Sequence, residues 1–384
     1  MSWKDKTVEQ SRMEFVLEVI SGEGSMSELC RKYGISRPTG YKWLERYMRG
    51  ENMEDRSHSP LTAAHRTKPE VEELILETRT RHPTWGGHKI VVFLRGKGHE
   101  YLPAASTVNA IIKRHGLISP EESEKHTPYK RFEREEPNQL WQMDFKGHFA
   151  MLNGERCHPL TITDDCSRKL ICLDAYNNEQ WKSVENSLLR VFSEYGLPDA
   201  ILSDNGRPWG DPQNGYTQYE VWMMQLGITP MHGRPLHPQT QGKEERFHRT
   251  LKEDVLMRTA ITDISHAQRV FDDYRAEFNS ERPHAALGYD VPDKHYRPSR
   301  RQLPEKWSEP EYAEGCTLRK VNYKGYISIN RRRYYLSESL IGKYIELDYL
   351  PDSRVNLYYG NYLIGIIDLD ENVFVSKKIY PRIV

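Results

Sequence analysis

Two aspartates stand where a charged side chain needs an explanation. Asp144 lies inside the alternating apolar run Trp141–Phe145 (WQMDF), which is typical of a strand. A carboxylate buried there costs free energy unless it is paired or bound to a metal ion. Asp204 directly follows the apolar segment Ala200–Leu202 and precedes a turn. Ligands of α/β sheets gather beyond the carboxyl ends of the strands, so Asp204 is also placed for chemistry.

A third group of acids lies in the segment His237–Lys252 (HPQTQGKEERFHRTLK), which is basic and favours a helix. It carries two adjacent glutamates, Glu244 and Glu245. Charged residues are mostly exposed and inert, so either could be an ordinary surface charge. The residues alone leave open which of the two is functional.

Carboxylates so far apart in sequence can converge only through tertiary folding. Where two or three do so, their oxygens are the hard ligands that Mg²⁺ or Mn²⁺ prefers. Two such ions about 4 Å apart activate a water or a 3′-hydroxyl and stabilise the leaving oxygen of a phosphodiester. The three acidic positions therefore indicate metal-dependent phosphodiester chemistry as one possibility.

Length and composition limit the kind of protein that carries these acidic residues. The chain has 384 residues, enough for two to four domains, with 29% charged and 37% hydrophobic residues. Its 55 basic and 55 acidic residues cancel, so a case for nucleic acid must come from local clustering. We expect no membrane span, no signal peptide and an intracellular protein. The five cysteines lack a C-x-x-C pair, as in a reducing compartment.

The N-terminal residues predict a helix-turn-helix. Ser25 and Glu28 have the spacing of a capping box, Gly34 breaks that helix, and Ser36 can cap the next one with Pro38 in its first turn. Between Arg31 and Arg49 there are six basic residues and one acid. This local charge suits a helix that approaches phosphates. The candidate DNA contacts are Arg37, Lys42 and Arg46.

The remaining segments predict a multidomain chain with an α/β centre. A second helical region follows, in which Ser106 is expected to cap a helix that Gly116 ends, and its charge is balanced. Short Tyr, Ile and Val runs near the C-terminus indicate a small β-barrel containing three consecutive arginines, Arg331–Arg333. The expected boundaries are 1–50 (helix-turn-helix), 51–67 (linker), 68–118 (second helix-turn-helix-like domain), 119–137 (linker), 138–291 (α/β core), 292–314 (connector) and 315–384 (β-barrel).

Three segments together resemble the retroviral-integrase-type core of bacterial insertion-sequence transposases: WQMDF, LSDNG and QGKEERFHRTLK. The resemblance extends to the leading helix-turn-helix and covers about nine-tenths of the chain. It implies a ribonuclease-H-like core with an Asp, Asp, Glu metal triad holding Mg²⁺ or Mn²⁺, two ions per site. The spacing after Asp204 is longer than the family's, with the extra length placed in Gly210–Thr217. The zinc-binding module of the retroviral enzymes is absent.

The resemblance also decides between the two glutamates. The family pattern Q-G-x-x-E places its glutamate four residues after Gln241, which selects Glu245 and leaves Glu244 a bystander. Asp144, Asp204 and Glu245 are therefore the expected catalytic and metal-binding residues. On a helix, one face carries Gln241, Glu245, Arg249 and Lys252, and the opposite, core-facing stripe carries Phe247, Leu251 and Val255. We expect Lys243, Arg249 and Lys252 to contact DNA.

The implied function is a transposase that binds the inverted terminal repeats of a mobile element. It would cleave phosphodiester bonds by hydrolysis and join the 3′ ends to target DNA. Action on two element ends implies a homodimer or higher oligomer on double-stranded DNA, in the bacterial cytoplasm at the nucleoid. Two alternatives remain: a metal-dependent nuclease that stops at hydrolysis, and a domesticated DNA-binding regulator.

Overall fold

A computed structural model describes residues 7–55, 67–118, 134–211, 215–233, 242–306 and 308–376. The chain divides into two compact units, residues 1–66 and 67–384. None of the helices within these ranges is long and apolar enough to cross a membrane.

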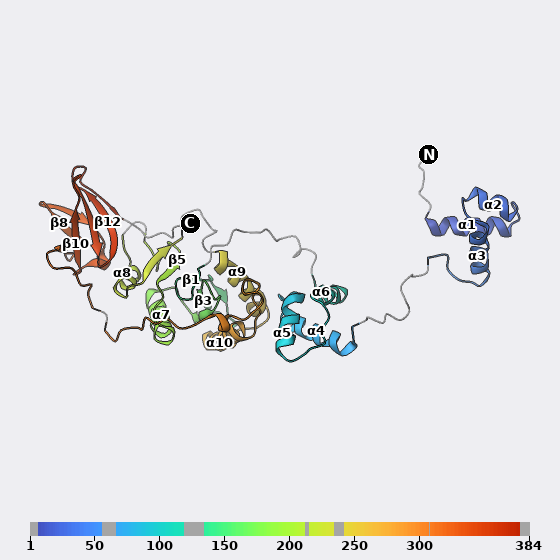
Figure 1. The fold of residues 1–384 in the computed structure, drawn as a ribbon, viewed down its shortest axis with the longest axis horizontal. Helices are drawn as coiled ribbons and strands as arrows, with labels where there is room; N and C mark the ends of the chain where they lie inside the picture. The colour runs from blue at the N-terminus through green and yellow to red at the C-terminus, as the bar shows by residue number, and fades with distance from the viewer. Residues whose placement is uncertain are drawn as a thin grey trace. The chain divides into compact units, whose positions relative to one another are not determined.

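Three helices form the first helical unit, residues 7–55 (Figure 1): α1 (Val8–Ile20), α2 (Met26–Lys32) and α3 (Arg37–Met48). The predicted caps are confirmed, because Ser25 and Glu28 form a capping box and the Ser36 hydroxyl accepts from the Thr39 amide. Six buried apolar residues make its core, namely Phe15, Val16, Leu29, Cys30, Trp43 and Met53. Met53 lies in the segment expected to be a linker, so the packed unit continues past residue 50.

The second helical unit, residues 67–118, contains α4 (Pro69–Arg81), α5 (Gly87–Gly96) and α6 (Ala105–Arg114). Trp85, Ile90 and Ile112 are among the buried residues that pack these helices together. The expected cap at Ser106 is wrong: α6 begins at Ala105, and its N-cap residue Ala104 makes no side-chain bond. The expected linker at 119–137 lies mostly outside the described residues.

A mixed sheet forms the centre of the α/β core. Its strands are β1 (Trp141–Phe145), β2 (Phe149–Ala150), β3 (Arg156–Asp164), β4 (Leu170–Tyr176), β5 (Ala200–Ser203) and β6 (Thr229–His232). β3 pairs antiparallel with β1, β2 and β4, whereas β1, β5 and β6 run parallel to one another. The expected strands at WQMDF and Ala200–Leu202 are confirmed.

Helices cover both faces of this sheet (Figure 1). On one face, α7 (Trp181–Tyr195) and α8 (Gln218–Gln225) pack against Trp141 and Met143 of β1. On the other face lie α9 (Gly242–Leu251) and α10 (Ile264–Ser280), joined in part by the π-helical turn η3 (Lys252–Leu256). Because side chains of a strand alternate, β1 directs Gln142 and Asp144 to the face opposite Trp141 and Met143.

The C-terminal region is all-β, as expected. Five antiparallel strands pair in the order β13–β12–β11–β10–β7: β7 (Thr317–Lys320), β10 (Tyr344–Tyr349), β11 (Arg354–Tyr359), β12 (Tyr362–Asp368) and β13 (Val373–Ser376). A separate hairpin joins β8 (Tyr326–Ile329) to β9 (Arg332–Tyr335). Pairings among the described strands leave β7 and β13 as edges, so a closed barrel stays a prediction.

Short helical segments complete the core and the C-terminal region: η4 (Ala285–Leu287), α11 (Pro292–His295) and η5 (Glu338–Leu340). The C-terminal sheet is tied to the core through Tyr216, whose hydroxyl donates to the Ile364 carbonyl over 2.8 Å. The expected connector also contacts the core, where Arg301 donates to the carbonyls of Pro198 and Gly227.

Gly40 provides a test of how tightly the first helical unit is packed. A methyl group there would lie 2.7 Å from the Cys30 sulfur and 3.0 Å from the Phe15 ring. We expect Gly40→Ala to lower the free energy of unfolding of residues 7–55 by about 1–3 kcal/mol through overpacking. Hydrogen exchange of these amides measures the loss. Gly24→Ala is the control, since its methyl would meet only ordinary contacts at 3.5 Å; equal losses in both variants would contradict the packing.

Candidate active site

The two predicted aspartates lie at the ends of neighbouring parallel strands. β1 and β5 pair with Gln142 opposite Leu202. Two residues further along each strand stand Asp144 and Asp204, so the register sets the two acids side by side. Both side chains are partly exposed rather than buried, and solvent therefore reaches them.

The charge of this pair is unfavourable in the protein alone. Burial, together with the nearby negative charges of Glu244 and Asp204, raises the pKa of Asp144 to about 8. Burial also raises the pKa of Asp204, although the Gly206 amide and His232 act in the opposite direction. Like charges held close together in a partly desolvated place favour protonation or a bound cation. These acids therefore have the character of an ion-binding pair.

Glu244 lies on the buried face of α9, in contact with β3, the strand that pairs with β1. Its side chain is 1% exposed. One carboxylate oxygen accepts from the Thr161 hydroxyl over 3.0 Å, and the other accepts from the Thr163 hydroxyl. Thr161 is the antiparallel partner of Asp144. Burial raises the pKa of Glu244 to about 7. Glu244 is therefore not an ordinary surface charge, and its exclusion from the metal-binding residues stays a prediction.

His248 extends the same polar layer. Its Nε2 lies 2.9 Å from the Thr161 hydroxyl, and its Nδ1 lies 4.0 Å from an Asp144 carboxylate oxygen. Burial, reinforced by the charge of Lys146, lowers the pKa of His248 to about 4. The imidazole is therefore neutral at physiological pH and acts as a hydrogen-bonding group beside Asp144. We call Thr161, Thr163, Glu244 and His248 the polar floor.

Asp204 is held by a second buried pair. The Nδ1 of His232 lies 2.8 Å from the Asp204 carbonyl, and its Nε2 lies 2.9 Å from a Glu220 carboxylate oxygen. His232 and Glu220 are each 1% exposed. The Asn205 side chain donates to the Gly233 carbonyl across the same turn. These bonds fix the backbone at Asp204 and leave its carboxylate directed to the site, where it accepts from the Gly206 amide.

The faces of α9 agree with the helical spacing. Phe247, Leu251 and Val255 are buried, whereas Glu245, Arg249 and Lys252 are exposed. Gln241, the first residue of the Q-G-x-x-E register, lies outside the described residues. Within the described ranges, no three His, Cys, Asp or Glu side chains converge closely enough to hold a metal ion. The structure thus brings Asp144 and Asp204 together and leaves Glu245 on the solvent side of the helix.

Lys243, expected to contact DNA, is engaged inside the protein. Its ammonium group lies 2.5 Å from a carboxylate oxygen of buried Asp165, which also accepts from Gln142. The neighbouring Asp164 caps its own turn by accepting from the amide and hydroxyl of Ser167. Both aspartates therefore hold the turn between β3 and β4, and the ammonium group of Lys243 pairs with one of them.

In the first helical unit, α3 presents two of the three expected DNA contacts. Arg37 and Lys42 are exposed. The Arg46 side chain is only 10% exposed, because it lies over the Trp43 ring and pairs with Glu51 at 3.4 Å. Arg46 therefore supports the helix surface rather than extending from it.

Two signals in the sequence could have revealed the polar floor. Glu244 precedes Phe247 by three residues and Leu251 by seven, which is the spacing of the buried stripe of α9. Thr161 and Thr163 alternate with Ile162 along β3, which indicates one polar and one apolar face. The pair of His232 and Glu220 has no such signal, because it depends on the packing of β6 against α8.

Comparison with protein families places this geometry in context. Residues 134–238 match a family described as an integrase core domain, and residues 226–292 match a second family with that description. Residues 11–60 match a helix-turn-helix domain, and residues 39–112 match a homeodomain-like domain. These matches cover the aspartate pair, α9 and both helical units.

The similar proteins include insertion-element proteins of bacteria. An insertion element IS136 protein of Agrobacterium fabrum is 30% identical over 159 residues, which are 39% of this chain and 78% of that protein. An insertion element IS407 protein of Burkholderia multivorans is 27% identical over 158 residues, 41% of this chain and 55% of the relative. This chain thus spans about half the length of the Burkholderia protein.

Among solved structures, the catalytic core domain of HTLV-2 integrase in complex with magnesium matches 42% of this chain and 99% of that chain. The sequence identity is 16% and the TM-score is 0.33.

The raised pKa of Asp144 predicts a pH-dependent stability. Between about pH 4 and pH 8 the carboxyl is ionised in the unfolded chain but protonated in the folded one, so rising pH destabilises the fold over this range. Asp144→Asn removes this effect. Without added metal, we therefore expect the Tm of the variant minus the Tm of the wild type to increase by about 2–4 °C as the pH rises from 5 to 8. Asp273→Asn, an exposed change on α10, is the matched control. A constant Tm difference across this range would contradict the raised pKa.

Proposed function

The chain belongs to the family of insertion-element proteins that carry an integrase core and helix-turn-helix domains, and from this we propose that it is a DNA transposase. It would cleave phosphodiester bonds at the ends of a mobile element by hydrolysis and join the 3′ ends to target DNA. The observation that carries the proposal is the pairing of Asp144 with Asp204 at adjacent strand ends of an integrase core. An exposed helix face bearing Glu245, Arg249 and Lys252 belongs to the same core.

The donor chemistry of this pair fits Mg²⁺ or Mn²⁺. Both groups are carboxylates, both are accessible, and each is disfavoured in its charged form by its surroundings. A divalent cation would remove this penalty, since hard oxygen ligands suit these ions. Two bound ions would supply an activated water or 3′-hydroxyl and would stabilise the leaving oxygen of the phosphodiester.

Accessibility favours Glu245 over Glu244 as the third ligand. Both oxygens of Glu244 accept hydrogen bonds from threonines, and its side chain is almost fully buried. A carboxylate that holds an ion against DNA must be reached by water and phosphate. Glu245 is exposed in the first turn of α9 and fits the spacing from Gln241. We therefore keep Asp144, Asp204 and Glu245 as the metal-binding set.

The role of Glu244 is then to support this set from below. Its bonds to Thr161 and Thr163 attach the start of α9 to β3, the strand paired with Asp144. Its negative charge beside Asp144 also strengthens the attraction of the site for a cation. Groups that orient metal ligands in this way affect metal affinity and activity although they do not touch the ion.

The cations nearby are placed for the DNA backbone. Arg249 and Lys252 are exposed one and two turns beyond Glu245 on the same face of α9. A scissile phosphate held beside carboxylates needs such cations to bind the strand on either side. Arg37 and Lys42 on α3 are proposed to contact the terminal repeats, and the second helical unit is proposed to assist them.

The partners follow from the reaction. Each event involves two element ends and a target, all double-stranded DNA, so we propose a homodimer or larger assembly on DNA. Its place of action would be the bacterial nucleoid.

The choice between the glutamates is tested by two matched substitutions. We expect Glu245→Gln to abolish cleavage and strand transfer in Mg²⁺ while DNA binding persists, because a metal ligand is lost. Glu244→Gln should slow both steps by about 10- to 100-fold, as expected for a residue that orients a ligand. The assay is strand transfer of a pre-cleaved terminal repeat into plasmid DNA.

Asp144→Asn is the inactive control, because it removes a proposed metal ligand. Asp273→Asn is the control that should stay fully active, because it changes an exposed aspartate on α10. If Glu245→Gln is fully active and Glu244→Gln is inactive, the third metal ligand is Glu244 and our assignment is wrong. Cleavage without any joining by the wild type would favour a nuclease, and inactivity in both steps with intact repeat binding would favour a regulator.

A further inference from the structure

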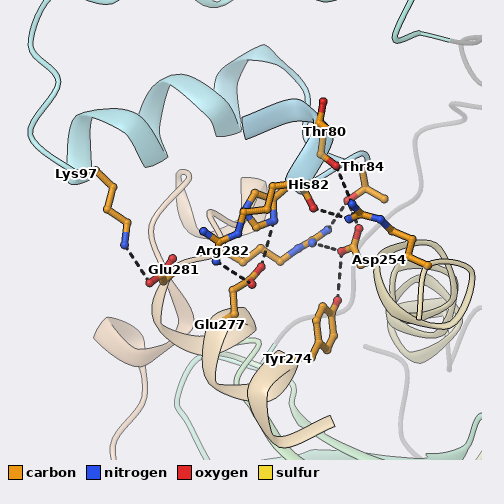
Figure 2. A network of polar contacts seen from close by, with 11 residues as sticks. Thr80, His82, Thr84, Lys97, Asp254, Tyr274, Glu277, Glu281 and Arg282 are labelled. Carbon is orange, nitrogen blue, oxygen red and sulfur yellow. Dashed lines mark hydrogen bonds and ion pairs between the residues drawn. The ribbon is translucent and has the colours of Figure 1, made fainter. Parts of the chain in front are cut away.

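The second helical unit contacts the core at the far end of the helix that carries Glu245. Asp254 lies in η3, which continues α9 without an interruption of the helical path. One Asp254 oxygen accepts from the Thr84 hydroxyl of the second helical unit over 2.9 Å. Figure 2 shows this bond. The other Asp254 oxygen accepts hydrogen bonds from the Arg282 guanidinium over 2.5 Å and from the Tyr274 hydroxyl over 3.3 Å.

The Asp254 contact is buried, unlike an ordinary surface ion pair. The side chains of Arg282 and Asp254 are 7% and 8% exposed. Arg282 also donates to the Thr84 hydroxyl over 3.3 Å, so the threonine closes a three-membered network. Buried polar groups depend on complete hydrogen bonding, which makes each member important for the geometry of the others. Arg282 therefore holds Asp254 and Thr84 together inside the protein.

Further bonds hold the turn after α4 against the core. His82 lies 3.1 Å from Glu277 of α10, and its ring is stacked on Trp85 with centroids 3.8 Å apart. Arg258, just beyond η3, donates to the Thr80 carbonyl over 2.7 Å. Lys97 and Glu281 form an exposed ion pair at the rim, 3.0 Å apart (Figure 2). The contact therefore joins the end of α4 to both η3 and α10.

The helix from Gly242 to Leu256 is consequently anchored at both ends. At its start, Glu244 is bonded to Thr161 and Thr163 of β3. At its end, Asp254 is bonded to Thr84 and Arg282. A π-helical turn such as η3 interrupts the α-helical register and is frequent at functional sites. The position of Glu245 along and around the helix axis thus depends on both anchors.

We propose that Asp254 is a positioning residue for Glu245, and that Thr84 of the second helical unit is its partner in that task. The second helical unit would then do more than contact DNA: while docked, it holds the active-site helix in the register that presents Glu245 to the aspartate pair. This inference rests on the proposed function for its catalytic consequence, but the mechanical link does not depend on it.

Thr84→Val tests the link, because it removes the hydroxyl and preserves the size of the side chain. We expect faster hydrogen exchange of the α9 amides in the full-length, metal-free protein, by about 5-fold for the loss of one hydrogen bond. In strand transfer, the Mg²⁺ concentration for half-maximal rate should rise by a similar factor while DNA affinity is unchanged. A purely structural role would lower Tm without moving this Mg²⁺ requirement.

Two matched variants sharpen the test. Thr80→Val makes the same change at an exposed threonine whose hydroxyl bonds only within α4 in the described structure, to the Leu76 carbonyl, and it should behave as wild type. Thr84→Ser retains the hydroxyl and should restore both readouts. Unchanged α9 exchange in Thr84→Val, or equal changes in Thr80→Val, would overturn the proposal. If Thr84→Val shows faster α9 exchange but the wild-type protein carries out no strand transfer, the link between Thr84 and α9 is supported and the proposed function is refuted.

Discussion

Two carboxylates placed at the ends of neighbouring parallel strands repel each other, and the organisation of the core around them follows from that constraint. The pairing of β1 with β5 sets Asp144 beside Asp204. Partial burial weakens the solvation of both, and the pKa of Asp144 rises to about 8. The ionised form of the pair is electrostatically unfavourable without a cation, and a bound cation would remove this penalty. In the absence of a cation, ionisation of the pair therefore opposes folding.

The residues around the pair are of two kinds: some hold the two aspartates in place, and others are exposed to solvent beside them. Below it, buried Thr161 and Glu244 and half-buried Thr163 and His248 form a hydrogen-bonded layer. Beside it, His232 and Glu220 hold the backbone at Asp204. On the exposed side, α9 presents Glu245, Arg249 and Lys252 to solvent, where we propose that they meet the metal ions and the DNA. The same helix thus carries one buried acid, Glu244, and one exposed acid, Glu245, and only the exposed one is proposed to take part in the reaction.

Much of this arrangement follows from local pattern in the sequence. The WQMDF alternation, the apolar strand before Asp204, the caps at Ser25 and Ser36 and the buried stripe of α9 depend on period and propensity, and each is present. Residue type gives no indication that Glu244 is buried, since charged residues are mostly exposed, although its spacing to Phe247 and Leu251 matches the buried stripe. Positive charge alone does not identify a DNA contact either, because Lys243 and Arg46 each have a partner inside the protein.

Other features could not be read from local pattern. The contact of Asp254 with Thr84 joins residues 170 positions apart, and only the packed structure brings them together. The pair of His232 and Glu220 has the same tertiary origin. Such tertiary contacts determine where α9 lies, whereas the sequence pattern predicts only that this segment is a helix.

The most direct test of the central claim is a crystal structure of the protein with Mn²⁺, in which anomalous scattering locates the ion. We predict an ion between the carboxylates of Asp144 and Asp204, with Glu245 turned toward it and Glu244 still bonded to Thr161 and Thr163. An ion bound by Glu244, or its absence from the aspartate pair at saturating Mn²⁺, would contradict the assignment of the site.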